Sequence, residues 1–335
     1  MDSAQPRLPL ALYVFRYLAA AGFRLGVEPH GLWHGVLGLH LREQCCVVPG
    51  GACQGCLLLH QCQYSYLFSG PRPPASDLMR RYDSIPVPHI LRLDRDYPDP
   101  IQAGDELTVS MVLVGAANER LPLIIQAMAA AGQGGLGPQR GQVWLHDVTQ
   151  QLPDASPPQL VATKGRLLDC PPPQPPAPPP APAAVRLQFT SPYKASGQAN
   201  RSGGLDLGPF LMALVRRASL LQYFYTGSQL EAPFAELKLA SEQARILDRA
   251  LRRQDGSRYA ARHGERVPTG GLIGHIDLDL SGIEALWPYL YLGQWLGVGK
   301  NASMGFGCYG LAALGSSADT SRSRGTAPEA GRISP

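Results

Sequence analysis

Apolar and polar residues follow two periodicities along the chain. Residues 8–17 alternate and contain aromatic and β-branched side chains, which predicts a strand. Residues 32–43 place apolar side chains at helical spacing, which predicts a helix. The remaining elements of this half are predicted, in chain order, as strands at 90–93 and 106–113, a helix at 121–131 and a strand at 141–148.

The second half shows a comparable order of elements. A strand at 185–189 is followed by helices at 207–225 and 232–251, a strand at 272–280, a helix at 281–292 and a strand at 308–314. In both halves a helix, a glycine-rich stretch and a strand come last. This repetition predicts two related β-α-β-β-α-β units and an α+β fold.

Composition divides the chain into four segments. Residues 171–182 are almost entirely Pro and Ala, which favours an extended spacer. The last 21 residues are rich in Ser, Thr, Arg and Gly, which predicts disorder. We therefore predict an N-terminal domain at 1–152, a proline-rich linker at 153–184, a C-terminal domain at 185–314 and a disordered tail at 315–335.

The glycine loop, residues 297–307 with the sequence GVGKNASMGFG, is the clearest candidate for chemistry. Glycines allow positive φ and close approach, so successive N–H groups of such a loop can face one ligand. Lys300 adds a positive charge, and Asn301 and Ser303 add hydrogen-bonding groups. The stretch predicts a loop that holds a phosphate-rich ligand, although a plain glycine-rich turn is an equal alternative. It has the spacing of neither a P-loop nor a dinucleotide fingerprint.

A second candidate site is the cysteine segment, residues 45–62, which holds five of the seven cysteines. The Cys53-x-x-Cys56 pair has chelate spacing in a glycine-rich setting. Crowded cysteines of this kind favour a metal cluster in a reducing compartment over a disulfide framework. We predict a structural zinc site formed by four thiolates, Cys46, Cys53, Cys56 and Cys62, with Cys45 in reserve and His60 as an alternative ligand.

The composition excludes some classes of protein. No stretch reaches the roughly 18 uninterrupted apolar residues of a membrane span, and the N-terminus does not have the pattern of a signal peptide. We expect a cytoplasmic protein. Arginine supplies 26 of the 30 basic residues, and its planar fork suits phosphates and bases, although a GC-rich genome favours arginine as well.

Several of these motifs together resemble the RAMP-superfamily endoribonucleases that process precursor CRISPR RNA. In chain order they are Thr190-Ser191-Pro192, Arg216-Arg217, Arg258-Tyr259, Gly271-Leu272-Ile273-Gly274 and the glycine loop. In the first half, residues 31–38 (GLWHGVLG) resemble the glycine-flanked first helix of the family, and the cysteine segment resembles a cysteine-bearing branch of it. The resemblance covers roughly residues 8–314.

This resemblance implies two tandem ferredoxin-like (RRM-like) domains that bind CRISPR repeat RNA. It also implies metal-independent cleavage, in which a ribose 2′-hydroxyl attacks the adjacent phosphate and leaves a 2′,3′-cyclic phosphate and a 5′-hydroxyl. The implied partners are repeat RNA, the mature crRNA and other subunits of a CRISPR effector complex, with no membrane and no direct DNA contact. No cofactor is implied for catalysis.

The implied catalytic residues lie near the first helix. Relatives place a catalytic histidine there, so His34 is the first candidate for the general base and His40 the second, with His60 and His30 behind them. Tyr64 is a candidate to orient or stack a base. For RNA binding the candidates are Arg216, Arg217, Arg258, Arg262, Gly299, Lys300, Asn301 and Ser303.

Two departures from the family pattern leave alternatives open. His34 stands where the family has an arginine, and Gly297 where many relatives have a histidine. One alternative is therefore a catalytically inactive RNA-binding subunit of an effector complex with the same fold. Another is a zinc-ribbon scaffold that binds proteins through its proline segment.

Overall fold

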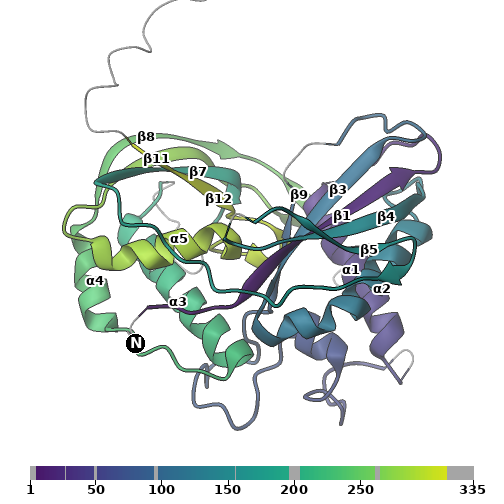
Figure 1. Ribbon diagram of the computed structural model, residues 1–335, viewed down its shortest axis with the longest axis horizontal. Coiled ribbons are helices and arrows are strands. Elements are labelled where there is room, and N and C mark those ends of the chain that lie inside the picture. Colours follow the sequence, from purple (N-terminus) through teal and green to yellow (C-terminus); the bar gives the residue numbers. More distant parts are fainter. Residues whose placement is uncertain are drawn as a thin grey trace, which may run out of the picture.

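The computed structural model describes residues 5–26, 28–48, 51–93, 97–154, 156–195, 204–260 and 265–314, with the backbone alone for 257–260 and 265–268. Two domains lie side by side, each with its helices against one face of an antiparallel sheet (Figure 1). Arg262 and the tail at 315–335 lie outside the described residues. Within the described ranges, no helix is long and apolar enough to cross a bilayer.

The first domain is a ferredoxin-like unit with an extended sheet. Its strand order is β2-β3-β1-β4-β5-β6, and the first and third strands are the inner two of its ferredoxin-like part, β2-β3-β1-β4. The elements are β1 (Leu10–Ala19), α1 (Pro29–Cys45), β2 (His89–Arg92), β3 (Glu106–Val114), α2 (Leu121–Gly134), β4 (Val143–Gln151), β5 (Gln159–Thr163) and β6 (Arg166–Leu167). Tyr13, Phe15 and Tyr17 alternate along β1 and are fully buried, which explains the period-2 pattern of this strand.

The second domain repeats the ferredoxin-like order in a four-stranded sheet, β12-β7-β11-β8. Its elements are β7 (Ala184–Tyr193), α3 (Leu207–Thr226), α4 (Phe234–Gln243), β8 (Arg245–Gln254), β11 (Gly271–Asp279), α5 (Trp287–Leu296) and β12 (Tyr309–Ala313). A separate hairpin, β9 (Ser257–Ala260) and β10 (Glu265–Pro268), follows β8. The predicted α+β fold with two ferredoxin-like units is confirmed.

One predicted element is wrong. Residues 232–251 were expected to form a single helix, but α4 ends at Gln243 and the chain continues as the edge strand β8. β8 pairs with β11 from Arg245 opposite Asp279 to Gln254 opposite Gly271. Pairing with a neighbouring strand thus overrides the local helical pattern of these residues.

The segment expected as a linker is attached to both domains. Its β5 and β6 extend the first sheet beside β4. The proline-rich part then follows the surface, where Gln150 Nε2 donates to the Pro171 carbonyl at 2.9 Å and Trp287 Nε1 donates to the Pro179 carbonyl at 2.7 Å. The chain therefore bridges the two sheets along a fixed path.

Candidate nucleic-acid interface

A shared core joins the two domains. Leu10, Ile90 and Val114 of the first sheet are fully buried in the same cluster as the side chains of α3 and α5. Arg92 at the end of β2 donates to the Gln294 carbonyl in α5 at 3.0 Å. The region around β2, the start of α1 and the glycine loop is called the domain interface below.

The glycine loop, residues 297–307, connects α5 to β12 and folds back on itself. The N–H groups of seven of its eleven residues donate to backbone carbonyls. Val298 N bonds the Gly307 carbonyl at 3.1 Å, and Gly307 N bonds the Pro192 carbonyl at 3.0 Å. The N–H groups of Gly299 and of the successive residues Asn301, Ala302 and Ser303 make no backbone bond among the described residues, so these groups and the polar side chains are what the loop can offer a ligand.

Two glycines of this loop permit close contacts that a side chain would prevent. A Cβ at Gly299 (φ +90°) would lie 2.4 Å from the Lys194 carbonyl oxygen. A Cβ at Gly305 (φ +92°) would lie 2.5 Å from the Leu91 carbonyl oxygen and 2.8 Å from His30 Cδ2. Gly305 therefore brings the loop of the second domain directly against β2 and α1 of the first.

The exposed part of the loop carries its polar side chains. Lys300 is exposed, and its N–H donates to the Lys194 carbonyl at 2.8 Å. Asn301 adopts a left-handed conformation (φ +62°), and Asn301 and Ser303 are half-buried. This surface can meet an anion through one ammonium group and two small polar groups.

Strand register places further cations at the same end of the second sheet. Tyr193 of β7 lies opposite Leu272 of β11, which in turn lies opposite Arg253 of β8. Because neighbouring strands are about 4.8 Å apart, the backbone of Arg253 lies roughly 10 Å from that of Tyr193, at the end of β7 beside the glycine loop. β8 exposes four arginines: Arg245, Arg249, Arg252 and Arg253.

None of these four arginines was among the predicted RNA-binding residues: Arg245 and Arg249 fell in the helix predicted at 232–251, and Arg252 and Arg253 directly follow it. The signal that could have identified them as RNA-binding candidates is a run of basic residues along an exposed edge strand. Arg258 lies in β9, directly after β8, so the chain brings it to the same end of the sheet as Lys300.

The Arg216–Arg217 pair divides between two environments. Arg216 is exposed, with its guanidinium carbon 5.7 Å from the centre of the Tyr82 ring. Arg217 Nε donates to the Leu296 carbonyl at 3.0 Å, its Nη2 has no exposed surface, and burial lowers its pKa to about 10. The expectation of RNA contact by Arg217 therefore needs correction: Arg217 fixes the end of α5, where the glycine loop begins.

His30 is the histidine of α1 that meets the glycine loop. Its ring centre lies 5.1 Å from that of Phe306. Glu28 caps α1 by accepting from the N–H groups of His30 and Gly31, both at 2.8 Å, and it also contacts His30 Nδ1 at 2.7 Å. Burial alone would raise the pKa of Glu28, but these hydrogen bonds outweigh it and leave the pKa below its usual value.

The expected catalytic residues lie farther from the loop. The His34 ring packs against Phe68, with 4.5 Å between centres, and its centre lies 5.8 Å from that of His89. His40 pairs with Glu43 through Nδ1 at 2.8 Å, on the side of α1 that approaches α2. Tyr64 is buried and stacks on Phe68. Of these three residues, only His34 lies on the same face of α1 as His30.

A buried histidine lies beneath His34. His89 is 1% exposed, and its Nδ1 contacts the Leu67 carbonyl at 2.8 Å. Burial, with a further contribution from the Arg217 charge, lowers the pKa of His89 to about 4. This side chain is therefore neutral near pH 7.

Two groups of side chains are candidates to bind a metal ion. The predicted cysteines all line one cavity, but no three of their sulfurs lie within 4.8 Å of one another. Asp248, His275 and Asp277 do meet that distance among the described residues. However, Arg186 makes two 2.7 Å bonds to the Asp277 carboxylate, so a cation already compensates that charge.

Family models match segments of both halves of the chain. Residues 187–309 match the family model described as CRISPR-associated endoribonuclease Cas6, and residues 8–173 match a model described as an N-terminal domain. No curated protein matches the chain significantly.

Solved structures show a similar two-domain arrangement. A Cas6 protein in a product complex is 17% identical, with a TM-score of 0.52, and the match covers 91% of this chain and 100% of that one. A Thermus thermophilus Cas6 is 15% identical (TM-score 0.49, covering 91% and 99%). A Cas6-related protein from Pyrococcus furiosus is 9% identical (TM-score 0.44, covering 90% and 98%). At such identities, the first of these likenesses establishes the fold.

Proposed function

We propose that this chain binds CRISPR repeat RNA and cleaves precursor crRNA, because its residues 187–309 match the family model described as CRISPR-associated endoribonuclease Cas6. One observation carries the proposal. The glycine loop of the Cas6 domain rests on His30, a histidine of the other domain whose second ring nitrogen is held by a carboxylate. A possible acid–base group and a cationic RNA surface thereby meet at one interface.

The chemistry we propose needs no metal. The 2′-hydroxyl oxygen attacks the adjacent phosphorus, and the bond from phosphorus to the 5′-oxygen breaks, which leaves a 2′,3′-cyclic phosphate and a 5′-hydroxyl. A base must take the 2′-hydroxyl proton and an acid must supply one to the 5′-oxygen. A nearby cation stabilises the charge that develops on the phosphate oxygens.

His30 suits the base. With Nδ1–H donated to Glu28, its Nε2 carries the lone pair that can accept a proton. Nε2 has no exposed surface and no hydrogen-bond partner among the described residues. RNA must therefore displace Phe306 to reach it, and a shift of the glycine loop on binding is part of the proposal.

His34 is the second candidate for the base. It lies one turn after His30 on the same face of α1, and it is half-buried rather than enclosed. His40 and Tyr64, which the family resemblance also implied, rank below these two because His40 lies on the side of α1 that approaches α2 and Tyr64 is buried against Phe68.

RNA binding is assigned to the cationic end of the second sheet. Lys300, with Asn301, Ser303 and the backbone at Gly299, forms one side, and Arg252, Arg253 and Arg258 follow along β8 and β9. Arg216 adds an exposed guanidinium on α3. We propose that these contacts keep the mature crRNA bound after cleavage and present it to other subunits of a CRISPR effector complex.

The alternative function is RNA binding without cleavage. The enclosure of His30 Nε2 favours it, because that nitrogen is not open to a substrate, and the half-buried His34 packs its ring on Phe68. The two functions share the RNA surface and differ only in the histidines.

The experiment is cleavage of the repeat RNA of the protein's own locus in EDTA by four purified proteins: wild type, His30→Ala, His34→Ala and His146→Ala. His146 is an exposed histidine of β4, remote from the interface, and serves as the matched control. We expect His30→Ala to slow cleavage by about 10²–10⁴-fold with RNA affinity kept, and His146→Ala to behave as wild type.

Each other outcome has a definite meaning. Full cleavage by His30→Ala together with loss in His34→Ala would move the base to His34. Tight RNA binding by the wild type with no cleavage would establish the alternative function. Failure to bind repeat RNA at all would refute both.

A further inference from the structure

The cysteine segment, residues 45–62, has little of the regular secondary structure and apolar burial that usually stabilise a folded chain. After α1 ends at Cys45, the described residues up to Cys62 form turns but no helix or strand. Large apolar side chains stand in solvent here, with Leu57 100% exposed and Val47 74% exposed. A segment that buries so little apolar surface needs another source of stability.

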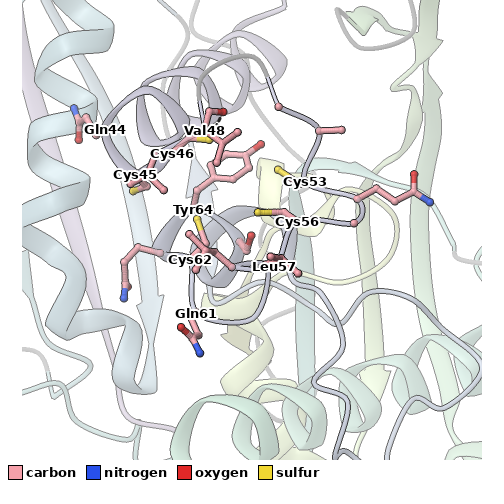
Figure 2. Close-up of a pocket in the computed structure, with 18 of the residues that line it drawn as sticks. Gln44, Cys45, Cys46, Val48, Cys53, Cys56, Leu57, Gln61, Cys62 and Tyr64 are labelled. Carbon is pink, nitrogen blue, oxygen red and sulfur yellow. Dashed lines mark hydrogen bonds between the residues drawn. The ribbon is translucent and has the colours of Figure 1, made fainter.

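Tight turns bring its thiols to one cavity. Cys56 N donates to the Cys53 carbonyl at 3.2 Å, with Gly55 between them at φ +80°, and Cys62 N donates to the Leu58 carbonyl at 2.9 Å. The cavity has a volume of about 860 Å³, and all five cysteines line it. Figure 2 shows the sulfurs of Cys53 and Cys56 next to each other, with Cys46 and Cys62 across the cavity.

We propose that this cavity closes around one zinc ion held by Cys46, Cys53, Cys56 and Cys62. The turn at 53–56 is a chelating pair, and all the cysteines are free thiols. Four thiolates at about 2.3 Å from the metal would fill a tetrahedral site with no open position, so the ion would be structural. Cys45 is the fifth thiol that lines the cavity, and a site of four thiolates does not need it.

Zinc binding requires a movement of the segment. In a tetrahedron with that bond length the sulfurs lie about 3.8 Å apart, whereas no three of them lie within 4.8 Å in this structure. The cavity is large and its wall at 51–58 is mostly exposed, so the turn can move towards the end of α1 with the loss of few buried contacts, among them that of Cys53 with the core of the first domain. The binding energy of the metal would supply the stability that apolar burial does not.

The site would also position a part of the first domain. Cys62 leads into the helical turn η1 (Ser65–Ser69), where Tyr66 N donates to the Cys62 carbonyl at 2.9 Å. Phe68 of this turn packs so closely on α1 that a Cβ at Gly38 would lie 2.3 Å from its ring. A metal at Cys62 would therefore hold Phe68, and with it the surroundings of His34.

The test measures metal binding directly, so it does not depend on the proposed function. The reduced full-length protein is titrated with Co²⁺ and, separately, loaded with Zn²⁺, freed of unbound metal and analysed for zinc by mass spectrometry. The variants are the double change Cys53→Ser/Cys56→Ser and the control Cys170→Ser, which removes an exposed thiol elsewhere.

We expect one zinc per wild-type chain, and a cobalt spectrum with the thiolate charge-transfer and intense visible bands of a tetrahedral site. Cys170→Ser should keep both, and the double variant should lose both. A chelator should lower the Tm of the wild type and of Cys170→Ser only. A wild type that retains no metal, or a double variant that retains one equivalent, would overturn the proposal. If the double variant does not fold, the wild-type cobalt spectrum decides.

Discussion

The two glycine-rich connections of this protein have the same place in their domains and different surroundings. Residues 132–141 link α2 to β4, where Leu136 and Gly141 exchange hydrogen bonds of 2.8 and 3.0 Å. A Cβ at Gly137 there would lie 2.4 Å from the Leu25 carbonyl oxygen, within the same domain. The glycine loop at 297–307 instead crosses to the other domain and rests on Leu91 and His30.

The difference shows that glycine content alone does not mark a functional loop. Both connections use positive φ and close approach to a carbonyl, which only glycine tolerates. In the first connection this gives a compact turn. In the second it brings a lysine-bearing loop and a carboxylate-held histidine of different domains into contact, and this contact is the basis of the proposed function.

The largest effect should come from adding one methyl group to each connection. Gly305→Ala and Gly137→Ala both place a Cβ at 2.4–2.5 Å from a carbonyl oxygen at positive φ, so each should lower the free energy of unfolding by on the order of 1–3 kcal/mol. Only Gly305→Ala changes how the loop is placed against His30, and with it the geometry from which the loop shifts when RNA binds. Since a misplacement of about 1 Å costs about 100-fold in rate, we expect that loss of RNA cleavage in Gly305→Ala alone.

Denaturant unfolding and single-turnover cleavage, measured on both variants, check this pair. Equal losses of cleavage in the two would mean that general destabilisation is responsible, and the contrast between the two connections would then carry no functional meaning.

The next effect concerns His89, the buried histidine of β2 whose ring lies near that of His34. The pKa of His89 is about 4 in the folded protein, because of burial, against about 6.5 when unfolded. The unfolded state therefore binds more protons between these values, and stability present above pH 6.5 is lost as pH falls towards 4. The loss is at most about 3 kcal/mol. His89→Asn, which does not titrate, should flatten the curve of unfolding free energy against pH.

Chemical denaturation at several pH values from 4 to 7 measures this curve, with His146→Asn as the exposed control. If the His89→Asn curve keeps the slope of the wild type, His89 is not the group responsible for the pH dependence, and its ring is less buried than described.

The smallest effect is expected in the salt dependence of RNA binding, when one exposed lysine from each domain is replaced. Lys300 lies in the glycine loop and Lys164 in the turn between β5 and β6, and both are exposed. Loss of one phosphate contact lowers the slope of log affinity against log salt by about 0.7 for single-stranded RNA. Lys300→Ala should show that change in repeat-RNA binding and Lys164→Ala should show none; the reverse result would place the RNA on the first domain.

Most of the fold could be predicted from the sequence because its periodicity is local. The alternation at 8–17 and the helical spacing at 32–43 reflect the buried faces of β1 and α1 directly. β8 could not be predicted, because it is an exposed edge strand without a buried face and no glycine or proline separates it from α4. Its partner, β11, is what makes it a strand.

The site could be predicted less well because it depends on contacts between domains. Lys300 is exposed in the loop, as its polar surroundings indicated, but Arg217 faces inwards at α5. His30 and His34 look alike in the sequence, and only the position of Phe306 distinguishes them. The roles of the site residues and the domain boundaries remain predictions, whereas the Cas6 family of residues 187–309 agrees with the resemblance seen in the sequence.

The most direct test of the central claim is end-group analysis of repeat RNA incubated with the wild-type protein in EDTA. We expect one main cut, a 2′,3′-cyclic phosphate on the upstream fragment and a 5′-hydroxyl on the downstream one. Cleavage that requires a divalent metal and leaves a 5′-phosphate, or the absence of any cut in RNA that is stably bound, would contradict it.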